Sequence, residues 1–204
     1  MPQVLLPTAY LPPVQFYSQL ISNADVLIEH FEHFVKQTYR NRCYIYSPNG
    51  RQTLVVPLAG RTERTITKDI RISYNDPWQK LHWRSFEAAY RRSAFFEFYE
   101  DDIHPFYTEK KYDFLIDFNL ALMELINTML KLNVKFSTTA TYEKNPTAIA
   151  DFRSILSPKS KLSADSGFQL KEYAQVFDLK HGFIPNLSIV DLLFNHGPRT
   201  LEYL

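Results

Sequence analysis

The sequence predicts an α/β fold: a mixed sheet that opens with a βαβ unit, followed by a β-hairpin and packed long helices. Three observations predict it: two short apolar runs flank a helical period, an Asn-Gly pair separates two strand-like runs, and long helical periods follow from residue 78. Because the chain has 204 residues, 45% of them apolar, we expect a single domain over 1–204. Its C-terminal portion, from about residue 140 to 204, is expected to be helical.

The opening unit is marked by prolines. Val4–Leu6 is a short apolar run that Pro7 ends, and Pro12-Pro13 leads into apolar residues at 14, 17, 20 and 21, which is a helical spacing. A second apolar run follows at 26–28. Strand, helix and strand in this order favour a parallel sheet, which binds ligands at the carboxyl ends of its strands. We therefore expect the loop Tyr10–Gln15 to lie at the ligand-binding edge.

The middle of the chain is expected to be antiparallel and then helical. Strand-like runs at 43–46 and 52–56 flank Ser47-Pro-Asn-Gly50, a strong hairpin signal. Residues 70–72 read as a short strand, 112–132 as the longest helix, and 134–136 as a further strand. The last helix has Ser188 as its predicted N-cap with Asp191 at N3, and Gly197-Pro198 ends it at Asn195 or His196.

Charge is unevenly distributed in a nearly neutral chain. The formal net charge is +1, yet residues 34–92 carry 12 of the 23 Lys and Arg residues and only 4 of the 22 acidic ones. This pattern indicates a localised site for an anionic small molecule and argues against a nucleic-acid-binding module, which is usually basic throughout. Solvated faces paired with acids from elsewhere are the alternative.

Several classes of protein are excluded by composition. The single cysteine, Cys43, rules out an intrachain disulfide and a cysteine-based zinc finger, and the five glycines form no phosphate-binding loop. The most apolar stretch, 114–132, contains Asp117 and Glu124, which a bilayer tolerates poorly. The N-terminus lacks the pattern of a signal peptide. We expect a cytoplasmic protein without a membrane span.

The densest group of recognition residues is the segment 36–42. Its cations suit phosphate or carboxylate, and its amides suit hydroxyls or base edges. In an extended segment the three cations would share a face; an exposed edge that discourages aggregation is the alternative. The ligand-binding residues proposed here are Lys36, Gln37, Arg40, Asn41 and Arg42.

The second candidate is the segment 78–84. Trp78 and Trp83 offer flat faces for a sugar or base, and His82 lies between cations that would hold it neutral, as a general base requires. Packing of these three residues in the core is the alternative. Together with Tyr10 and Gln15, which lie in the loop after the first strand, they complete the predicted ligand pocket, in which His82 is the candidate catalytic residue.

A metal is not expected. His30 and His33 have a spacing that suits one helical face, but no third histidine follows, so we expect ordinary polar roles for both. The acids Glu97, Glu100, Asp101 and Asp102 are expected to balance the basic segment. No cofactor can be named from the residues.

An ordered set of motifs resembles the WbqC-like proteins over nearly the whole chain. The motifs are Pro7–Tyr17, Ala24–Ile28, Tyr39–Arg42, Thr53–Pro57, His82-Trp83, Tyr90–Phe96 and Asn186–Leu193. The chain departs from the family pattern in having Leu6-Pro7 in place of Gln-Pro and Pro12-Pro13 in place of Pro-Trp. The second departure removes an aromatic ring from the predicted pocket.

The resemblance implies a role in surface-polysaccharide (O-antigen-type) biosynthesis, because WbqC-like genes occur among such gene sets. The implied ligand is an activated or nucleotide-linked sugar, and the implied enzyme is a transferase acting on it. The fold also resembles nucleotidyltransferase-like domains, but their His-x-Gly-His signature is absent from residues 10–17. A non-catalytic ligand-binding or accessory protein of the same pathway remains the alternative.

Overall fold

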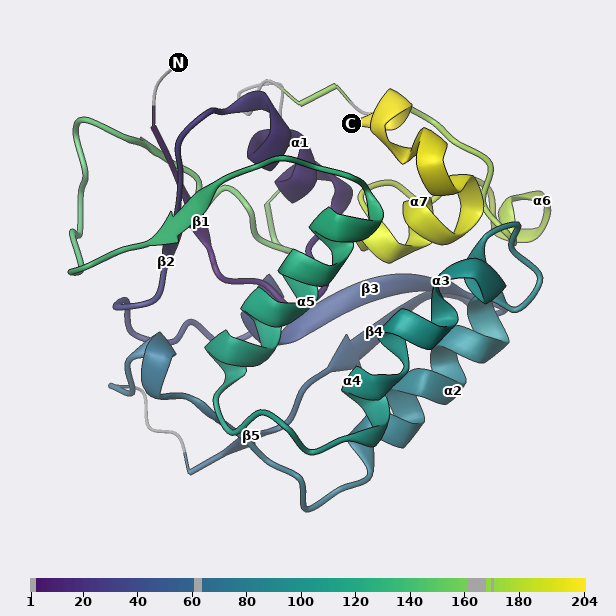
Figure 1. Cartoon of the computed structure of the whole chain (residues 1–204), viewed down its shortest axis with the longest axis horizontal. Coiled ribbons are helices and arrows are strands. Elements are labelled where there is room, and N and C mark those ends of the chain that lie inside the picture. Colours follow the sequence, from purple (N-terminus) through teal and green to yellow (C-terminus); the bar gives the residue numbers. More distant parts are fainter. Residues whose placement is uncertain (1–2, 61–63, 161–167, 170) are drawn as a thin grey trace.

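The computed structural model describes residues 3–60, 64–160, 168–169 and 171–204 (Figure 1). The structure has two layers that meet in its interior. One is a parallel sheet with its helices, and the other is a hairpin with a second group of helices. The strands are β1 (Val4–Pro7), β2 (Val26–Glu29), β3 (Arg42–Ser47), β4 (Gly50–Val55), β5 (Leu58–Ala59), β6 (Arg71–Ile72), β7 (Phe136–Thr138) and β8 (Ala150–Asp151). The α-helices are α1 (Val14–Ser22), α2 (Trp78–Tyr90), α3 (Phe96–Ile103), α4 (Pro105–Thr108), α5 (Leu115–Met129), α6 (Asp178–His181) and α7 (Ile189–His196).

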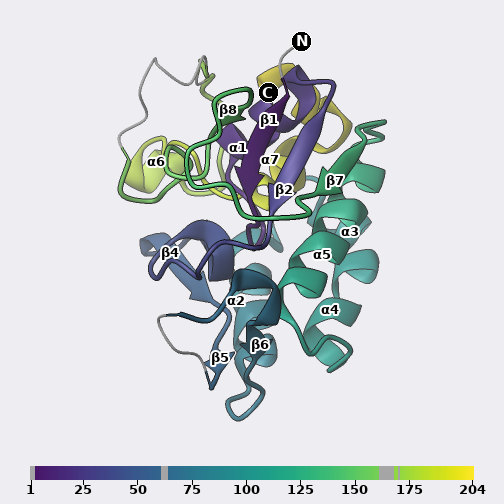
Figure 2. The ribbon, with the colours of Figure 1, turned by 90° about the vertical axis from the view of Figure 1, so that its left-hand side faces the viewer.

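The main sheet has four parallel strands in the order β7-β2-β1-β8, which lie side by side in Figure 2. The predicted βαβ unit is confirmed, because β1 pairs with β2 in parallel and α1 joins them. Strand β8 joins β1 on its other side, so the strand order reverses between β1 and β8. Ligands of open parallel sheets bind outside the carboxyl ends of the strands at such a reversal.

The two faces of this sheet are covered differently. On one face, Phe16 of α1 and Met123 of α5 pack around Ile28 of β2. On the other face, Leu5 and Leu27 line a cavity of about 330 Å³ that is closed by the connection between β7 and β8. This connection, residues 139–149, therefore takes the place of a helix above the ends of the strands.

The predicted hairpin is confirmed in full: β3 and β4 pair antiparallel from Arg42–Val55 to Ser47–Gly50. It forms a sheet of its own, and so do the antiparallel strands β5 and β6. The expectation of one mixed sheet is corrected in this respect, since the main sheet is wholly parallel. The hairpin packs against α2 and α7 through β3.

The long helices are shorter than their apolar periods predicted. The predicted helix 112–132 forms as α5 over Leu115–Met129, because Phe114 is extended and Lys131 adopts a left-handed conformation with φ 53°. The strand expected at 134–136 lies two residues later as β7. No helix in the described part of the chain combines the length and apolarity needed to cross a membrane.

The C-terminal portion is helical only from Asp178 onward. Between residues 139 and 177 the described chain is mostly irregular and contributes the short strand β8. Ser188 caps α7 as predicted: its Oγ accepts a hydrogen bond from the backbone N of Val190 at 3.4 Å. Asp191 does not complete a capping box; its carboxylate accepts hydrogen bonds from Tyr90 and Tyr173 instead, which ties α7 to α2.

Candidate functional site

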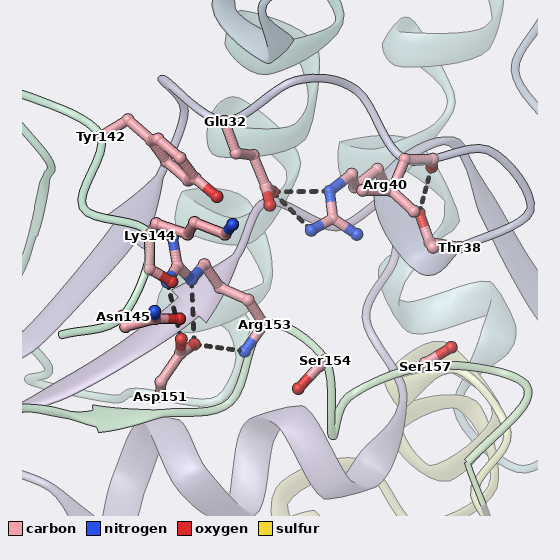
Figure 3. A pocket seen from close by; sticks show the side chains of 11 residues that line it. Glu32, Thr38, Arg40, Tyr142, Lys144, Asn145, Asp151, Arg153, Ser154 and Ser157 are labelled. Atoms are coloured by element: carbon pink, nitrogen blue, oxygen red, sulfur yellow. Dashed lines mark hydrogen bonds and ion pairs between the residues drawn. The ribbon is translucent and has the colours of Figure 1, made fainter. Parts of the chain in front are cut away.

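A polar cavity of about 460 Å³ opens at the carboxyl ends of β1, β2 and β8 (Figure 3). Three segments line it: residues 32–40 after β2 and, far from these in the sequence, residues 142–145 in the connection before β8 and residues 151–157 from the end of β8. The cavity thus lies where the strand order reverses. Its charged lining residues are Glu32, Arg40, Lys144, Asp151 and Arg153.

Arg40 and Glu32 form a buried ion pair on one wall. Nε and Nη2 of Arg40 lie 2.7 and 2.5 Å from Oε1 of Glu32. Asn119 of α5 holds the Arg40 backbone by donating from Nδ2 to its carbonyl oxygen at 2.8 Å. Burial raises the pKa of Glu32, and the Arg40 cation opposes this rise. The pair therefore places a carboxyl with a raised pKa on the cavity wall.

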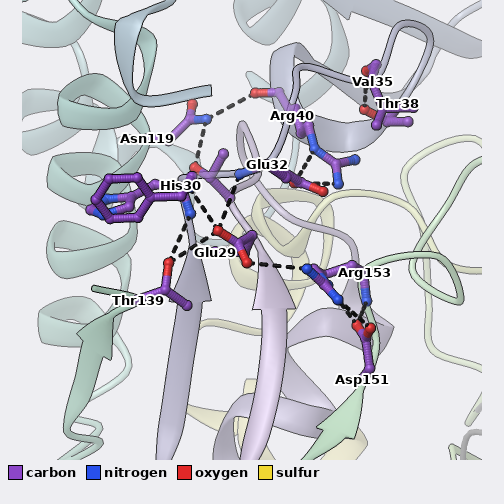
Figure 4. A network of polar contacts seen from close by, with 12 residues as sticks. Glu29, His30, Glu32, Val35, Thr38, Arg40, Asn119, Thr139, Asp151 and Arg153 are labelled. Atoms are coloured by element: carbon purple, nitrogen blue, oxygen red, sulfur yellow. Dashed lines mark hydrogen bonds and ion pairs between the residues drawn. The ribbon is translucent and has the colours of Figure 1, made fainter. Parts of the chain in front are cut away.

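Arg153 is the centre of a second network below the cavity (Figure 4). Its Nε and Nη2 donate to Oδ1 and Oδ2 of Asp151 at 2.9 and 2.7 Å, and its Nη1 donates to Oε2 of Glu29 at 3.1 Å. Burial would raise the pKa of Asp151, but the hydrogen bonds and charge of Arg153 outweigh it and the pKa falls. This bidentate geometry fixes the guanidinium in position.

Glu29, at the end of β2, links the strands to the loops around the cavity. Its Oε1 accepts hydrogen bonds from the backbone N of Phe31 at 2.6 Å, the backbone N of Glu32 at 3.2 Å and Oγ1 of Thr139 at 3.0 Å. The side chain is fully buried and its charge is balanced by Arg153. Glu29 is therefore a positioning residue that ties the lining segments 32–40 and 151–157 to Thr139 at the start of the connection.

The remaining lining groups are suited to a hydroxyl-bearing anion. Lys144 is exposed, and Ser154, Ser157, Thr38 and Asn145 add neutral hydrogen-bonding groups. Phosphate needs cationic donors, and sugar hydroxyls need neutral donors and acceptors. The cavity supplies both within a volume that suits a small-molecule ligand.

No metal site is formed by the described residues, among which no three His, Cys, Asp or Glu side chains are grouped to hold an ion. Nδ1 of His33 lies 2.9 Å from the Arg64 carbonyl oxygen, and the His30 ring packs edge-on against Phe31. That the protein needs no metal stays a prediction.

Of the residues that the sequence proposed, Arg40 lines this cavity and the others lie elsewhere. Lys36 and Gln37 are exposed in a turn where Gln37 is left-handed with φ 60°, and Tyr39–Asn41 form a 3-10 helix. The segment is thus not extended, and its three cations do not share a face. Asn41 donates from Nδ2 to the Val56 carbonyl oxygen at 2.9 Å, and the half-buried Arg42 begins β3.

Tyr10, Trp78 and His82 meet in the interior. The Tyr10 hydroxyl lies 2.9 Å from Nδ1 of His82 and 2.8 Å from the Tyr107 hydroxyl, and Trp78 packs edge-on against the His82 ring. Burial lowers the pKa of His82 to about 4, which keeps the ring neutral as expected, although the cause is burial rather than neighbouring cations. These rings form part of the hydrophobic core, where His82 is 5% exposed.

Gln15 and Trp83 also make structural contacts. Gln15 is buried in α1 and accepts a hydrogen bond at Oε1 from Nδ2 of Asn186 at 3.3 Å. Trp83 is partly buried, with its ring centroid 4.5 Å from that of His104. The loop after β1 does meet the 36–42 segment, because the Tyr10 backbone N donates to the Tyr39 carbonyl oxygen at 2.9 Å. Ligand contact by the interior residues stays a prediction.

The comparison with known families agrees with the motifs seen in the sequence. The model of the WbqC-like protein family matches residues 8–167 and 166–203. The chain belongs to the WbqC-like protein family. All three segments that line the cavity lie inside the first matched region, so the cavity is built from WbqC-like sequence throughout.

A chain of similar length among curated proteins is similar to this one. The "Uncharacterized protein Rv1507c" of Mycobacterium tuberculosis (strain ATCC 25618 / H37Rv) is 28% identical over 216 residues, which span 94% of this chain and 93% of that protein. No solved structure gives a significant match. These comparisons identify the family but not the reaction.

Most residues of this WbqC-like cavity were missed by the sequence interpretation. Asp151 ends a strand of two residues and Arg153 follows it, and so short a strand shows no periodicity. Tyr142 and Lys144 lie in a polar connection without a motif. The one usable signal was the apolar pair Ile149-Ala150 followed by the charged residues Asp151 and Arg153, since polar residues after a buried strand mark a ligand-binding edge.

Proposed function

We propose that this WbqC-like protein binds a nucleotide-linked sugar in the cavity at the carboxyl ends of the parallel strands. We further propose that it acts on this ligand as a cytoplasmic enzyme of surface-polysaccharide biosynthesis. The observation that carries the proposal is the lining itself: Lys144, Arg40 and Arg153 beside the hydroxyls of Ser154 and Ser157. The pathway is supported by the resemblance to WbqC-like proteins.

Glu32 is the lining group best suited to move a proton. It lines the cavity, and burial raises its pKa although the Arg40 cation opposes the rise. In a transferase the ionised Glu32 would accept the proton of an acceptor hydroxyl or amine as that group attacks the sugar and the nucleotide leaves with the electrons of the broken bond. Arg40 pairs with the carboxylate and so favours the ionised form that accepts the proton. His82 remains the candidate of the sequence analysis, but its path to the cavity would have to cross the core.

A non-catalytic binding protein is the second candidate. It is favoured by the pairing of the lining carboxylates, because Glu32 and Asp151 each accept short hydrogen bonds from an arginine and are thereby held as structural anions. Turnover separates the two candidates: incubation with nucleotide-linked sugars, followed by chromatography of the products, should show conversion only if the protein is an enzyme.

Binding is tested first by thermal shift over a set of nucleotide-linked sugars. A ligand present at 100 times its Kd stabilises the folded protein by about 2.7 kcal/mol. Lys144→Ala should weaken binding roughly tenfold to a hundredfold, the loss expected for a hydrogen bond to a charged group. Lys135→Ala is the matched control, because Lys135 is exposed and precedes β7 away from the lining residues. Equal losses for both variants would contradict the assignment of this cavity.

A further inference from the structure

Tyr142 presents an aromatic ring at the mouth of an otherwise ionic cavity. Its side chain is 48% exposed although it lines the cavity, and Val35, which is 47% exposed, lines the same cavity. Figure 3 shows the Tyr142 ring directed across the opening, with its hydroxyl toward Glu32. Two of the exposed large apolar side chains in the described part of the chain thus gather at one opening.

The ring is held in place from the cavity floor. The guanidinium carbon of Arg153 lies 5.3 Å from the Tyr142 ring centroid, within the range of a cation–π contact. Arg153 also donates from Nη2 to the carbonyl oxygen of Lys144 at 3.3 Å, and so fixes the chain two residues beyond the tyrosine. Because Arg153 is itself fixed by Asp151 and Glu29, the ring is preorganised before a ligand arrives.

The connection that carries Tyr142 separates two cavities. Tyr142, Lys144 and Asn145 line the ionic cavity, whereas Thr141, Glu143 and Pro146 line the smaller one above Leu5 and Leu27. The start of the connection is fixed by the Thr139 backbone N, which donates to the Ile28 carbonyl oxygen at 3.1 Å. Each of these side chains therefore lines one of the two cavities.

We propose that Tyr142 is the stacking surface for the nucleobase of a nucleotide ligand, whose phosphates bind beside Lys144 and the two arginines. This inference rests on the proposed function and specifies which part of the ligand lies at the cavity mouth. One face of the tyrosine contacts Arg153, and the base would cover the other. Stacking on an aromatic side chain tolerates any base, since every base has a flat π face.

The polar groups of the cavity favour a base over a pyranose at this position. A pyranose carries several hydroxyls, and the neutral groups that would bond them, Ser154, Ser157 and Asn145, line other parts of the wall. A base can remain partly exposed at the opening without losing hydrogen bonds to water at its edges. The phosphates then lie near the cations, between the base and the sugar.

Isothermal titration calorimetry with UDP, GDP and inorganic pyrophosphate tests this proposal. Tyr142→Ala should weaken the binding of both nucleotides about fivefold to a hundredfold, the range for loss of a stacked aromatic ring. The same substitution should change the affinity for pyrophosphate less than twofold. Tyr142→Phe keeps the ring and should bind nucleotides as the wild type does. Phe98→Ala removes an exposed aromatic side chain on α3, away from the cavity, and serves as the matched control.

Two results would overturn the stacking role while leaving the proposed function intact. In one, Tyr142→Ala weakens pyrophosphate as much as it weakens the nucleotides; in the other, Tyr142→Phe loses as much affinity as Tyr142→Ala, which would indicate a hydroxyl contact. If the wild type binds neither nucleotide nor pyrophosphate, the proposed function fails, and the stacking role fails with it.

Discussion

Arg40 directs two guanidinium nitrogens at a single oxygen of Glu32, and both side chains are almost closed to solvent, at 2% and 9% exposed. A buried ion pair loses most of its solvation on folding, so each partner depends on the other for stability. The pair that lines the cavity is therefore also a structural element, and substitutions there change folding as well as binding.

We predict that Arg40→Ala lowers the free energy of unfolding by roughly 3–5 kcal/mol, because it leaves the Glu32 carboxylate buried without its cation. The double variant Arg40→Met with Glu32→Met replaces both charges by apolar groups and should regain most of this loss. Urea unfolding of the wild type and the variants measures the difference. A double variant no more stable than Arg40→Ala would show that the two side chains are not coupled.

A second prediction concerns Asp191, which is fully buried and accepts hydrogen bonds from Tyr90 at 2.7 Å, Tyr173 at 2.8 Å and Gln175 at 3.1 Å. Burial raises the pKa of Asp191 to about 6, although these hydrogen bonds oppose the rise. The folded state thus holds the proton more tightly than the unfolded state. Consequently this group makes the free energy of unfolding fall as the pH rises from about 4 to about 6, by roughly 3 kcal/mol.

Asp191→Asn removes this titration while retaining an oxygen that can accept from Tyr90. The difference in unfolding free energy between the wild type and this variant should therefore change by roughly 3 kcal/mol across the same pH window. Taking the difference cancels the titration of other groups. A difference that stays constant from pH 4 to pH 7 would contradict the raised pKa.

His82 should titrate in the opposite sense. Burial lowers the pKa of His82 to about 4. As the pH falls, the unfolded state therefore takes up a proton near pH 6.5, whereas the folded state does so only near pH 4. The contribution of this group to the free energy of unfolding is fully present above pH 6.5. It decreases by about 3 kcal/mol as the pH drops toward 4. In a pH titration followed by NMR, the His82 ring should remain neutral at pH 5.5. An ordinary midpoint near 6.5 would show that the ring is open to solvent.

The end of α7 provides a prediction with an internal control. A Cβ on Gly197 would lie 2.5–2.7 Å from ring atoms of Phe95, whereas a Cβ on Gly182 would meet no described atom within 4 Å. Both glycines have positive φ, 53° and 72°. Gly182→Ala should therefore cost about 1–3 kcal/mol of backbone strain, and Gly197→Ala should cost roughly 1–3 kcal/mol more because of the clash with Phe95. Equal thermal stability of the two variants would exclude the clash.

The sequence was informative where local signals coincide with the tertiary structure. The βαβ unit, the hairpin and the end of α7 each depend on residues a few positions apart, such as Pro13 before α1 and Gly197 after α7. The parallel arrangement of the main sheet could not be predicted completely. Strand β8 has two residues, and its place beside β1 depends on pairing across most of the chain.

The candidate site was predicted only in part, for a related reason. Basic and aromatic residues close in sequence drew attention to 36–42 and 78–84, yet the two segments lie in different places. Arg40 lines the cavity, whereas Trp78 and His82 pack among the rings of the core. A segment rich in aromatic residues has the same composition whether it lines a cavity or packs in the core, so its composition does not distinguish the two. Most of the other residues that line the cavity with Arg40 come from 142–157, and their proximity to Arg40 follows from sheet order rather than from any local pattern.

The late position of β8 in the chain has a consequence for synthesis on the ribosome. Strand β1 emerges first, but its neighbour on one side is not made until roughly three quarters of the 204 residues have been joined. Until then the unpaired N–H and C=O groups along that edge of β1 are available to other chains, as in any open strand edge. Pairing between such distant segments is also slow, because a long loop must close first. Nascent chains that stop short of residue 150 should therefore depend on chaperones far more than the finished protein does.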